Sequence, residues 1–163
     1  MDKMERIAIK EGGLDDPRVI NLLNIHLTNA RAATIEGNVW ALDLSGLKVP
    51  EIRFWTIWDE DSDSLLGMGA IKRLSPSHYE LKSVHTAEVA RGRGVATRML
   101  QHLIRIAKEL GAELLSLETG SWSYFHPARE MYKKYGFVEC GPFGDYPPDI
   151  NSIFMTKDLS IEL

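Results

Sequence analysis

The sequence has a single cysteine, no long apolar run and no surplus of positive charge. The lone Cys140 excludes an intramolecular disulfide and a thiolate zinc cluster, and no N-terminal segment resembles a signal peptide, so we expect a reducing cytoplasm. No apolar stretch approaches the roughly 20 residues of a membrane span, which predicts a soluble protein without a membrane partner. The formal net charge of -4 disfavours a nucleic-acid partner, because such proteins usually carry a basic surplus.

The length and apolar content of the chain fit one domain with a hydrophobic core. It has 163 residues, 44% of them hydrophobic, and we expect a single domain over residues 1–163. The acidic run 59–63 resembles a metal-binding loop at first sight. Because it lacks the Gly and the distal Glu of a calcium loop, we interpret it as a solvated turn and predict no metal site.

Hydrophobic periodicity predicts an α+β fold with helices flanking a mixed, mostly antiparallel sheet. Helix start signals stand at Asp15-Asp16-Pro17, and a short second helix is expected within 30–50. The clearest helix is 95–110, ended by Gly111, and a shorter one follows at 127–135. The expected strands are 5–10, 53–58, 65–72, 78–86, 112–119, 137–140 and 152–157.

A glycine- and arginine-rich stretch joins the strand 78–86 to the longest helix. Backbone N–H groups at a helix N-terminus bind phosphate, and glycines allow the backbone to approach a ligand closely. The sequence therefore predicts a pyrophosphate-binding cradle. The cradle consists of Arg91, Gly92, Arg93, Gly94, Val95 and Ala96.

Two motifs in this order resemble the GNAT superfamily of acetyl-CoA-dependent N-acetyltransferases. The first is Arg91-x-x-Gly94-x-Ala96. The second follows a further strand and reads Ala128-Arg129-x-Met131-Tyr132-x-x-Tyr135-Gly136-Phe137. The likeness covers roughly residues 53–156, and the tail is similar to a bacterial branch of small acetyltransferases. A plain nucleotide-binding fold is disfavoured, because the chain has no GxxxxGKS or GxxxxGKT motif.

The resemblance implies where acetyl-CoA, the cosubstrate, would bind. The fourth and fifth strands would splay apart, and the pantetheine arm would pair with the backbone of Val84, His85 and Thr86. The diphosphate would rest on main-chain N–H groups of residues 91–96. The Val84 N–H would stabilise the oxyanion, and Tyr132 would act as general acid toward the coenzyme sulfur.

The general base has several candidates. Glu80 lies four residues before Val84, so strand alternation puts both on one face, and a similar offset carries the base in a branch of the superfamily. Glu118, near the end of the next strand, is a second candidate. The side chains of His85 and His126 titrate in the useful range, and a chain of waters without a single base is a further alternative.

The acceptor side is implied to lie in residues 26–47 and 122–149. Phe125 replaces an Asn that is common in the superfamily, which removes one usual contact to the coenzyme. No feature decides between an amino acid, a polyamine, an aminoglycoside and a protein N-terminus, so the predicted partner is a small-molecule or peptide amine. The candidate lining residues are Trp40, Trp122, Tyr124, His126, Phe143 and Tyr146.

Two functional hypotheses follow from these observations. The first is an N-acetyltransferase in which the amine attacks acetyl-CoA directly within a ternary complex, since nothing marks Cys140 as an acyl carrier. The alternative is a sensor module that binds CoA or acyl-CoA without turnover. Exposed strands in this architecture often pair, so a homodimer is compatible with either hypothesis.

Overall fold

The computed structural model describes residues 6–33 and 40–161. Its strands are β1 (Ile7–Glu11), β2 (Ile52–Asp59), β3 (Ser64–Ser75), β4 (His78–Thr86), β5 (Leu114–Gly120), β6 (Val138–Cys140) and β7 (Ser152–Asp158). Its helices are α1 (Pro17–Ala33), α2 (Leu44–Leu47), α3 (Val95–Glu109) and α4 (His126–Lys134), with 3-10 turns at Glu88–Ala90 and Ser123–Phe125. Each expected strand and helix has a counterpart among these elements, although Glu5, the expected first residue of a strand, lies outside the described residues.

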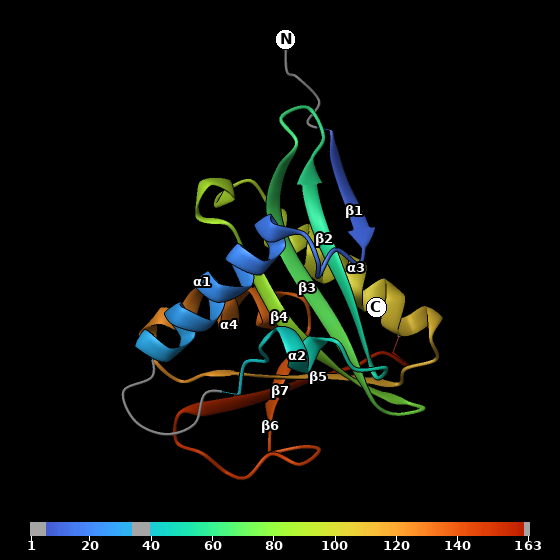
Figure 1. Cartoon of the computed structure of the whole chain (residues 1–163). Coiled ribbons are helices and arrows are strands. Elements are labelled where there is room, and N and C mark those ends of the chain that lie inside the picture. The colour runs from blue at the N-terminus through green and yellow to red at the C-terminus, as the bar shows by residue number, and fades with distance from the viewer. Residues whose placement is uncertain (1–5, 34–39, 162–163) are drawn as a thin grey trace.

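The strands form one seven-stranded sheet in the order β1-β2-β3-β4-β5-β7-β6 (Figure 1). Its neighbouring strands are antiparallel except for β4 and β5, which run parallel. The parallel connection passes through α3, as a crossover between parallel strands requires. This arrangement confirms the predicted α+β class with a mixed, mostly antiparallel sheet.

The sheet opens between β4 and β5. The two strands pair only where His78–Glu80 lies beside residues 114–116. Beyond this short ladder β4 continues to Thr86 and β5 to Gly120, and the two strands no longer pair. The predicted splay is therefore confirmed, and it leaves one backbone edge of β4 free to meet a ligand.

Helices cover both faces of the sheet. On one face α3 and α4 pack over a core that includes Met99, Leu103 and Tyr132. On the other face α1 packs over a second core that includes Leu23 and Met68 (Figure 1). The two cores fix the sheet from both sides, so the position of the open edge is set by buried packing.

Gly69 of β3 allows α3 to lie close against the sheet. A Cβ atom at this position would lie 2.8 Å from Cγ of Met99 and 2.9 Å from Cδ1 of Leu103. We expect Gly69→Ala to lower the free energy of unfolding by about 1–3 kcal/mol through overpacking, as measured by chemical denaturation. Gly141→Ala is the control, because no described residue other than its chain neighbours comes within 4 Å of a Cβ there. Equal losses in both variants would contradict this packing argument.

Candidate functional site

The predicted cradle is a turn in which two glycines adopt the left-handed backbone conformation, and it leads into the first turn of α3. Gly92 and Gly94 have φ angles of 81° and 73°, a region that L side chains rarely adopt. The first helical hydrogen bond runs from the Arg98 N–H to the Gly94 carbonyl, 3.0 Å away. The amides that precede Arg98 in the helix therefore have no acceptor within it, and their N–H groups form a candidate anion site.

Two side chains of this turn point away from that anion site. The guanidinium of Arg93 lies 3.2 Å from the Asp59 carboxylate, and this hydrogen bond lowers the pKa of that carboxyl. Val95 is buried in the core on the α3 side of the sheet. Apart from the flanking residues, no atom of the described part of the chain lies within 4 Å of a Cβ placed on Gly92 or Gly94. Open space thus borders the glycines, and main-chain N–H groups form the surface that a phosphate would meet.

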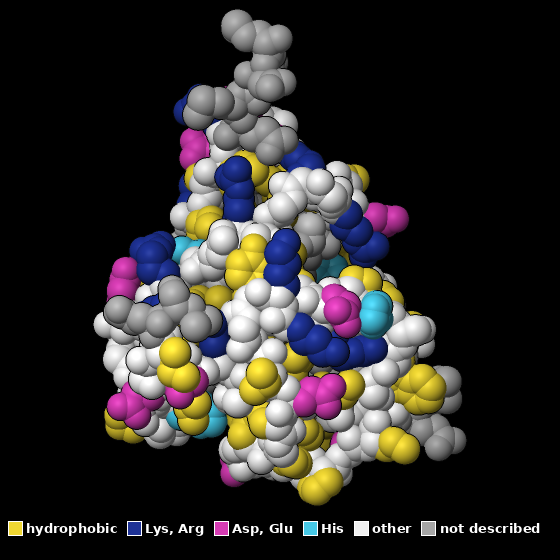
Figure 2. All heavy atoms as spheres, turned by 180° about the vertical axis from the view of Figure 1, so that it is seen from behind, with side chains coloured by type: hydrophobic (Ala, Val, Ile, Leu, Met, Phe, Trp, Pro, Cys, Tyr) yellow, Lys and Arg dark blue, Asp and Glu magenta, His cyan; other side chains and the backbone are white. Residues whose placement is uncertain are grey.

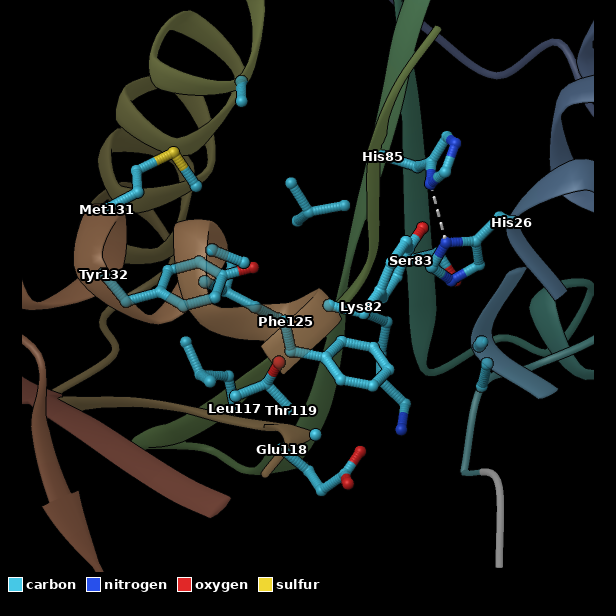
Figure 3. A pocket seen from close by; sticks show the side chains of 18 of the residues that line it. His26, Lys82, Ser83, His85, Leu117, Glu118, Thr119, Phe125, Met131 and Tyr132 are labelled. Atoms are coloured by element: carbon cyan, nitrogen blue, oxygen red, sulfur yellow. Dashed lines mark hydrogen bonds between the residues drawn. The ribbon is translucent and has the colours of Figure 1, made fainter. Parts of the chain in front are cut away.

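A cavity of about 510 Å³ lies where β4 and β5 diverge (Figure 3). This volume is typical of a small-molecule or cofactor site. Residues of α1, β4, β5 and α4 form its wall, so segments far apart in the sequence meet there. Of the predicted site residues, those lining the cavity are Val84, His85, Thr86, Arg91, Ala96, Glu118 and Tyr132.

A β-bulge in β4 overturns one prediction about the strand faces. Lys82 pairs with Ala70 and His85 with Met68, so Ser83 and Val84 together oppose the single Gly69. Ser83 has a φ angle of 54°, and the bulge shifts the alternation by one residue.

Glu80 and Val84 consequently lie on opposite faces of the sheet. Val84 packs against the core that contains Met99, whereas Lys82, on the same face as Glu80, pairs with Ala70 of the other core. The expectation that strand alternation puts both on one face was wrong. The periodicity of the sequence carried no sign of the bulge, because the bulged residue is Ser rather than Gly.

Glu80 is occupied by polar partners on its own face. Its side chain is 2% exposed and pairs with the Lys82 ammonium at 3.0 Å. It also accepts a hydrogen bond from the Tyr146 hydroxyl. The cavity wall includes Lys82 but not Glu80. The structure therefore places Glu80 behind Lys82, with its carboxylate already satisfied.

Glu118 of β5 is the carboxyl group that lines the cavity (Figure 3). Ser152 donates a hydrogen bond to its carboxylate over 2.8 Å. Burial raises the pKa of Glu118 from the ordinary 4.5 to about 7, despite that hydrogen bond and the nearby Lys82 charge, which both lower it. A carboxylate with such a pKa accepts a proton readily near neutral pH.

The same burial predicts a pH-dependent loss of stability. Because the folded-state pKa of Glu118 is raised, its contribution is fully present below pH 4.5 and is lost as the pH rises through about 7. Glu118→Gln stays neutral at every pH. Between pH 4.5 and pH 8 we therefore expect its free energy of unfolding to rise by about 2 kcal/mol relative to that of the wild type. Denaturant titrations at both pH values measure this change. Glu139→Gln, at an exposed position, should show no such trend.

Tyr132 of α4 reaches the cavity from the opposite side. Its ring packs edge to face on Phe137, with ring centroids 5.7 Å apart, and its hydroxyl points into the cavity (Figure 3). Burial raises the pKa of this phenol to about 12. The hydroxyl therefore keeps its proton at neutral pH and can donate it to a basic leaving group.

A pair of histidines connects α1 to β4 at the cavity wall. Nδ1 of His26 and Nδ1 of His85 lie 3.0 Å apart, so one ring donates and the other accepts. Burial lowers the pKa of both to about 4. The expectation that His85 titrates in the useful range was wrong, because desolvation keeps it neutral. His126 is exposed on α4 and lies 4.0 Å from Glu130.

Only part of the predicted aromatic pocket belongs to the cavity. Trp40 and Tyr124 line the cavity, whereas Trp122, His126, Phe143 and Tyr146 do not. Phe125, where the superfamily often has Asn, projects into the cavity beside Tyr132 (Figure 3). A Cβ on Gly120 would lie within 2.7 Å of three atoms of the Phe125 ring, so the ring is held against β5.

Other features of the described residues bear on possible partners. Within 6–33 and 40–161, none of the helices is long and apolar enough to cross a membrane. The same ranges contain no group of three or more His, Cys, Asp or Glu side chains arranged to hold a metal ion. On the face seen in Figure 2, basic side chains lie interspersed with acidic ones.

The chain resembles known proteins over most of its length. The model of the Acetyltransferase (GNAT) family matches residues 20–137. YsnE of Bacillus subtilis, an uncharacterized N-acetyltransferase, is 44% identical over 151 residues, covering 93% of this chain and 99% of YsnE. YedL of Escherichia coli, also an uncharacterized N-acetyltransferase, is 36% identical over 152 residues, covering 93% of this chain and 94% of YedL.

Solved structures agree on the fold. The crystal structure of a GNAT-family acetyltransferase from Staphylococcus aureus superposes with a TM-score of 0.74 at 19% identity. The match covers 94% of this chain and 99% of that one. Together with the sequence relatives and the cavity between β4 and β5, this likeness confirms the resemblance drawn from the two motifs. The chain belongs to the GNAT family of acetyltransferases, which transfer the acetyl group of acetyl-CoA to an amine.

Proposed function

We propose that this chain acetylates a primary amine inside the cavity between β4 and β5, with Glu118 as general base and Tyr132 as general acid. The observation that carries the proposal is that these two groups line the same cavity from opposite sides. One is a carboxylate whose pKa lies near 7, and the other is a phenol that stays protonated. The acceptor is a small-molecule or peptide amine.

The described residues fit acetyl-CoA. Main-chain N–H groups of residues 91–96 would hold the diphosphate at the N-terminus of α3, where the left-handed Gly94 caps the helix without a side chain. The free edge of β4 at Val84, His85 and Thr86 would pair with the pantetheine arm. When bound, the cosubstrate supplies an acetyl thioester that an amine can attack.

Proton transfer at the amine is the task we assign to Glu118. A free amine has a pKa near about 10, so most of it is protonated at pH 7 and cannot attack until a base removes the proton. Glu118 faces the cavity, whereas Glu80 lies behind Lys82. Glu80 acting through water, or water alone, is the competing proposal.

Two other groups would stabilise the negative charge that develops at the reacting carbonyl and at the sulfur. The Val84 N–H, in the bulge of β4, would donate to the carbonyl oxygen as negative charge develops there. Tyr132 would return a proton to the departing thiolate. The exposed Cys140 lies on β6 and not in the cavity wall, which supports direct attack in a ternary complex.

We further propose that residues 1–163 act as one domain, in the cytoplasm, without a membrane or nucleic-acid partner. The sheet joins β1 to β7 without interruption, which supports a single unit. A homodimer through an exposed edge such as β6 remains compatible with this proposal, because Val138 there is 62% exposed. Size-exclusion chromatography with light scattering measures the oligomeric state.

The test of the proposed reaction is thiol release from acetyl-CoA across a panel of amines, with acetyl-CoA binding followed separately by calorimetry. We expect acetyl-CoA to bind and thiol to be released with at least one amine. If acetyl-CoA binds but none of the amines leads to thiol release, the sensor alternative is favoured. The two assays separate these hypotheses because the sensor requires binding alone.

A further inference from the structure

A largely buried ammonium group lies at the cavity wall, and the proposed reaction does not use it. Lys82 of β4 donates from Nζ to Glu80 over 3.0 Å and to the Tyr146 hydroxyl over 2.6 Å. Its side chain is 11% exposed and lines the cavity. An ammonium has three N–H donors, so one donor has no acceptor among the described residues.

Lys82 is held in place by partners from a distant segment. The Tyr146 hydroxyl also donates to Glu80, which closes a cluster of three side chains. The Tyr146 ring packs edge to face against Trp40, with ring centroids 5.5 Å apart. Packing and hydrogen bonds therefore fix the ammonium before any ligand arrives, so little side-chain entropy is lost when its third donor is used.

The cavity presents two opposite charges to its contents. In Figure 3 the Lys82 and Glu118 side chains end in the same part of the view, below Phe125, and both residues line the cavity, from β4 and β5 respectively. The two groups are close enough that the Lys82 charge acts on the Glu118 carboxyl. A carboxylate beside a cation with a free donor matches a molecule that itself carries an amine and an anion.

We propose that the acceptor is a small amine that also carries an anionic group, as an amino acid does, and that Lys82 binds this anion. The inference rests on the proposed function and adds the substrate class. Glu118 would receive the amine while Lys82 fixes the carboxylate, so the two contacts orient the nucleophile. Trp40, Tyr124 and Phe125 supply an apolar wall for the remainder of the molecule.

The positive charge of Lys82 disfavours the binding of polycationic acceptors. A polyamine or an aminoglycoside would bring a second positive charge toward Lys82, and the repulsion would weaken its binding. Glu80 partly offsets the charge of Lys82, but it does so from behind, at a 2% exposed position. Selectivity between anionic and polycationic amines is therefore the property that the cavity predicts.

The experiment compares kcat/KM for amino acids with kcat/KM for their decarboxylated amines, and it includes spermidine. We expect the wild type to prefer the acids by about 10–100-fold, the range of a hydrogen bond to a charged group. Lys82→Met should lower this ratio by about the same factor. A wild type that prefers spermidine or the decarboxylated amines would overturn the inference.

Lys82→Met leaves the Glu80 carboxylate buried without its cation, which destabilises a fold. The double variant Glu80→Gln/Lys82→Met removes both charges and should show the same loss of preference. Glu80→Gln alone keeps the ammonium and should keep the preference. An unchanged ratio in the double variant would overturn the role of Lys82. If none of the amines tested supports thiol release, both the proposed function and this inference are overturned.

Discussion

Glu118→Gln is expected to lower kcat/KM by about 100–1,000-fold at pH 8, the scale of general-base catalysis. The glutamine keeps the size of the side chain and can still accept the hydrogen bond of Ser152, which lies 2.8 Å away in the wild type. It cannot take a proton from the amine. Because the substitution leaves the cradle at 91–96 untouched, affinity for acetyl-CoA measured by calorimetry should change little.

The pH profile distinguishes a base from a merely structural carboxylate. Burial raises the pKa of Glu118 to about 7, so its basic form accumulates above this pH and wild-type kcat/KM should rise through it. This rise should be absent from Glu118→Gln. Glu80→Gln is the matched control, since Glu80 lies behind Lys82. If Glu80→Gln removes the rise and Glu118→Gln retains it, the base is Glu80.

Tyr132→Phe is expected to lower kcat by about 100-fold, since the departing thiolate loses its proton donor. The ring is retained, so its edge-to-face contact with Phe137 persists. Burial raises the pKa of the phenol to about 12, which keeps the donor protonated throughout the working pH range. Single-turnover kinetics with acetyl-CoA measure the loss at the chemical step.

Tyr135→Phe is the control for the acid. Tyr135 ends α4 three residues later and lies outside the cavity wall, so its hydroxyl should be dispensable. Tyr132→Phe with normal kcat but weakened acetyl-CoA binding would contradict the acid role. Tyr132 would then only order the coenzyme.

Local sequence signals were sufficient to predict the sheet and the glycine-rich turn that precedes α3. The strand 78–86, the glycines at 92 and 94 and the long apolar stripe of α3 each depend on near neighbours in the chain. The resemblance to the GNAT superfamily, carried by the two motifs, then implied the splay between β4 and β5. The left-handed φ of Gly94 is the conformation that a glycine at this point suggests.

The orientation of the site residues depended on contacts that the sequence does not show. The bulge at Ser83 moved Glu80 to the opposite face from Val84, although no glycine marks it. His26 and His85 form a hydrogen bond although they are 59 residues apart in the sequence, and Tyr146 and Glu80 do so at a separation of 66 residues. The raised pKa of Glu118 likewise arises from burial by distant segments. Strand alternation alone therefore could not choose between the two carboxylates.

Calorimetric titration of Gly94→Trp with acetyl-CoA tests whether the main chain at 91–96 binds the diphosphate. The indole would stand in the open space beside Gly94. Gly111→Trp is the matched control, because Gly111 also has a positive φ and open space but lies at the other end of α3. We expect the wild type and Gly111→Trp to bind acetyl-CoA and Gly94→Trp to lose this binding. Unchanged binding by a folded Gly94→Trp would contradict it.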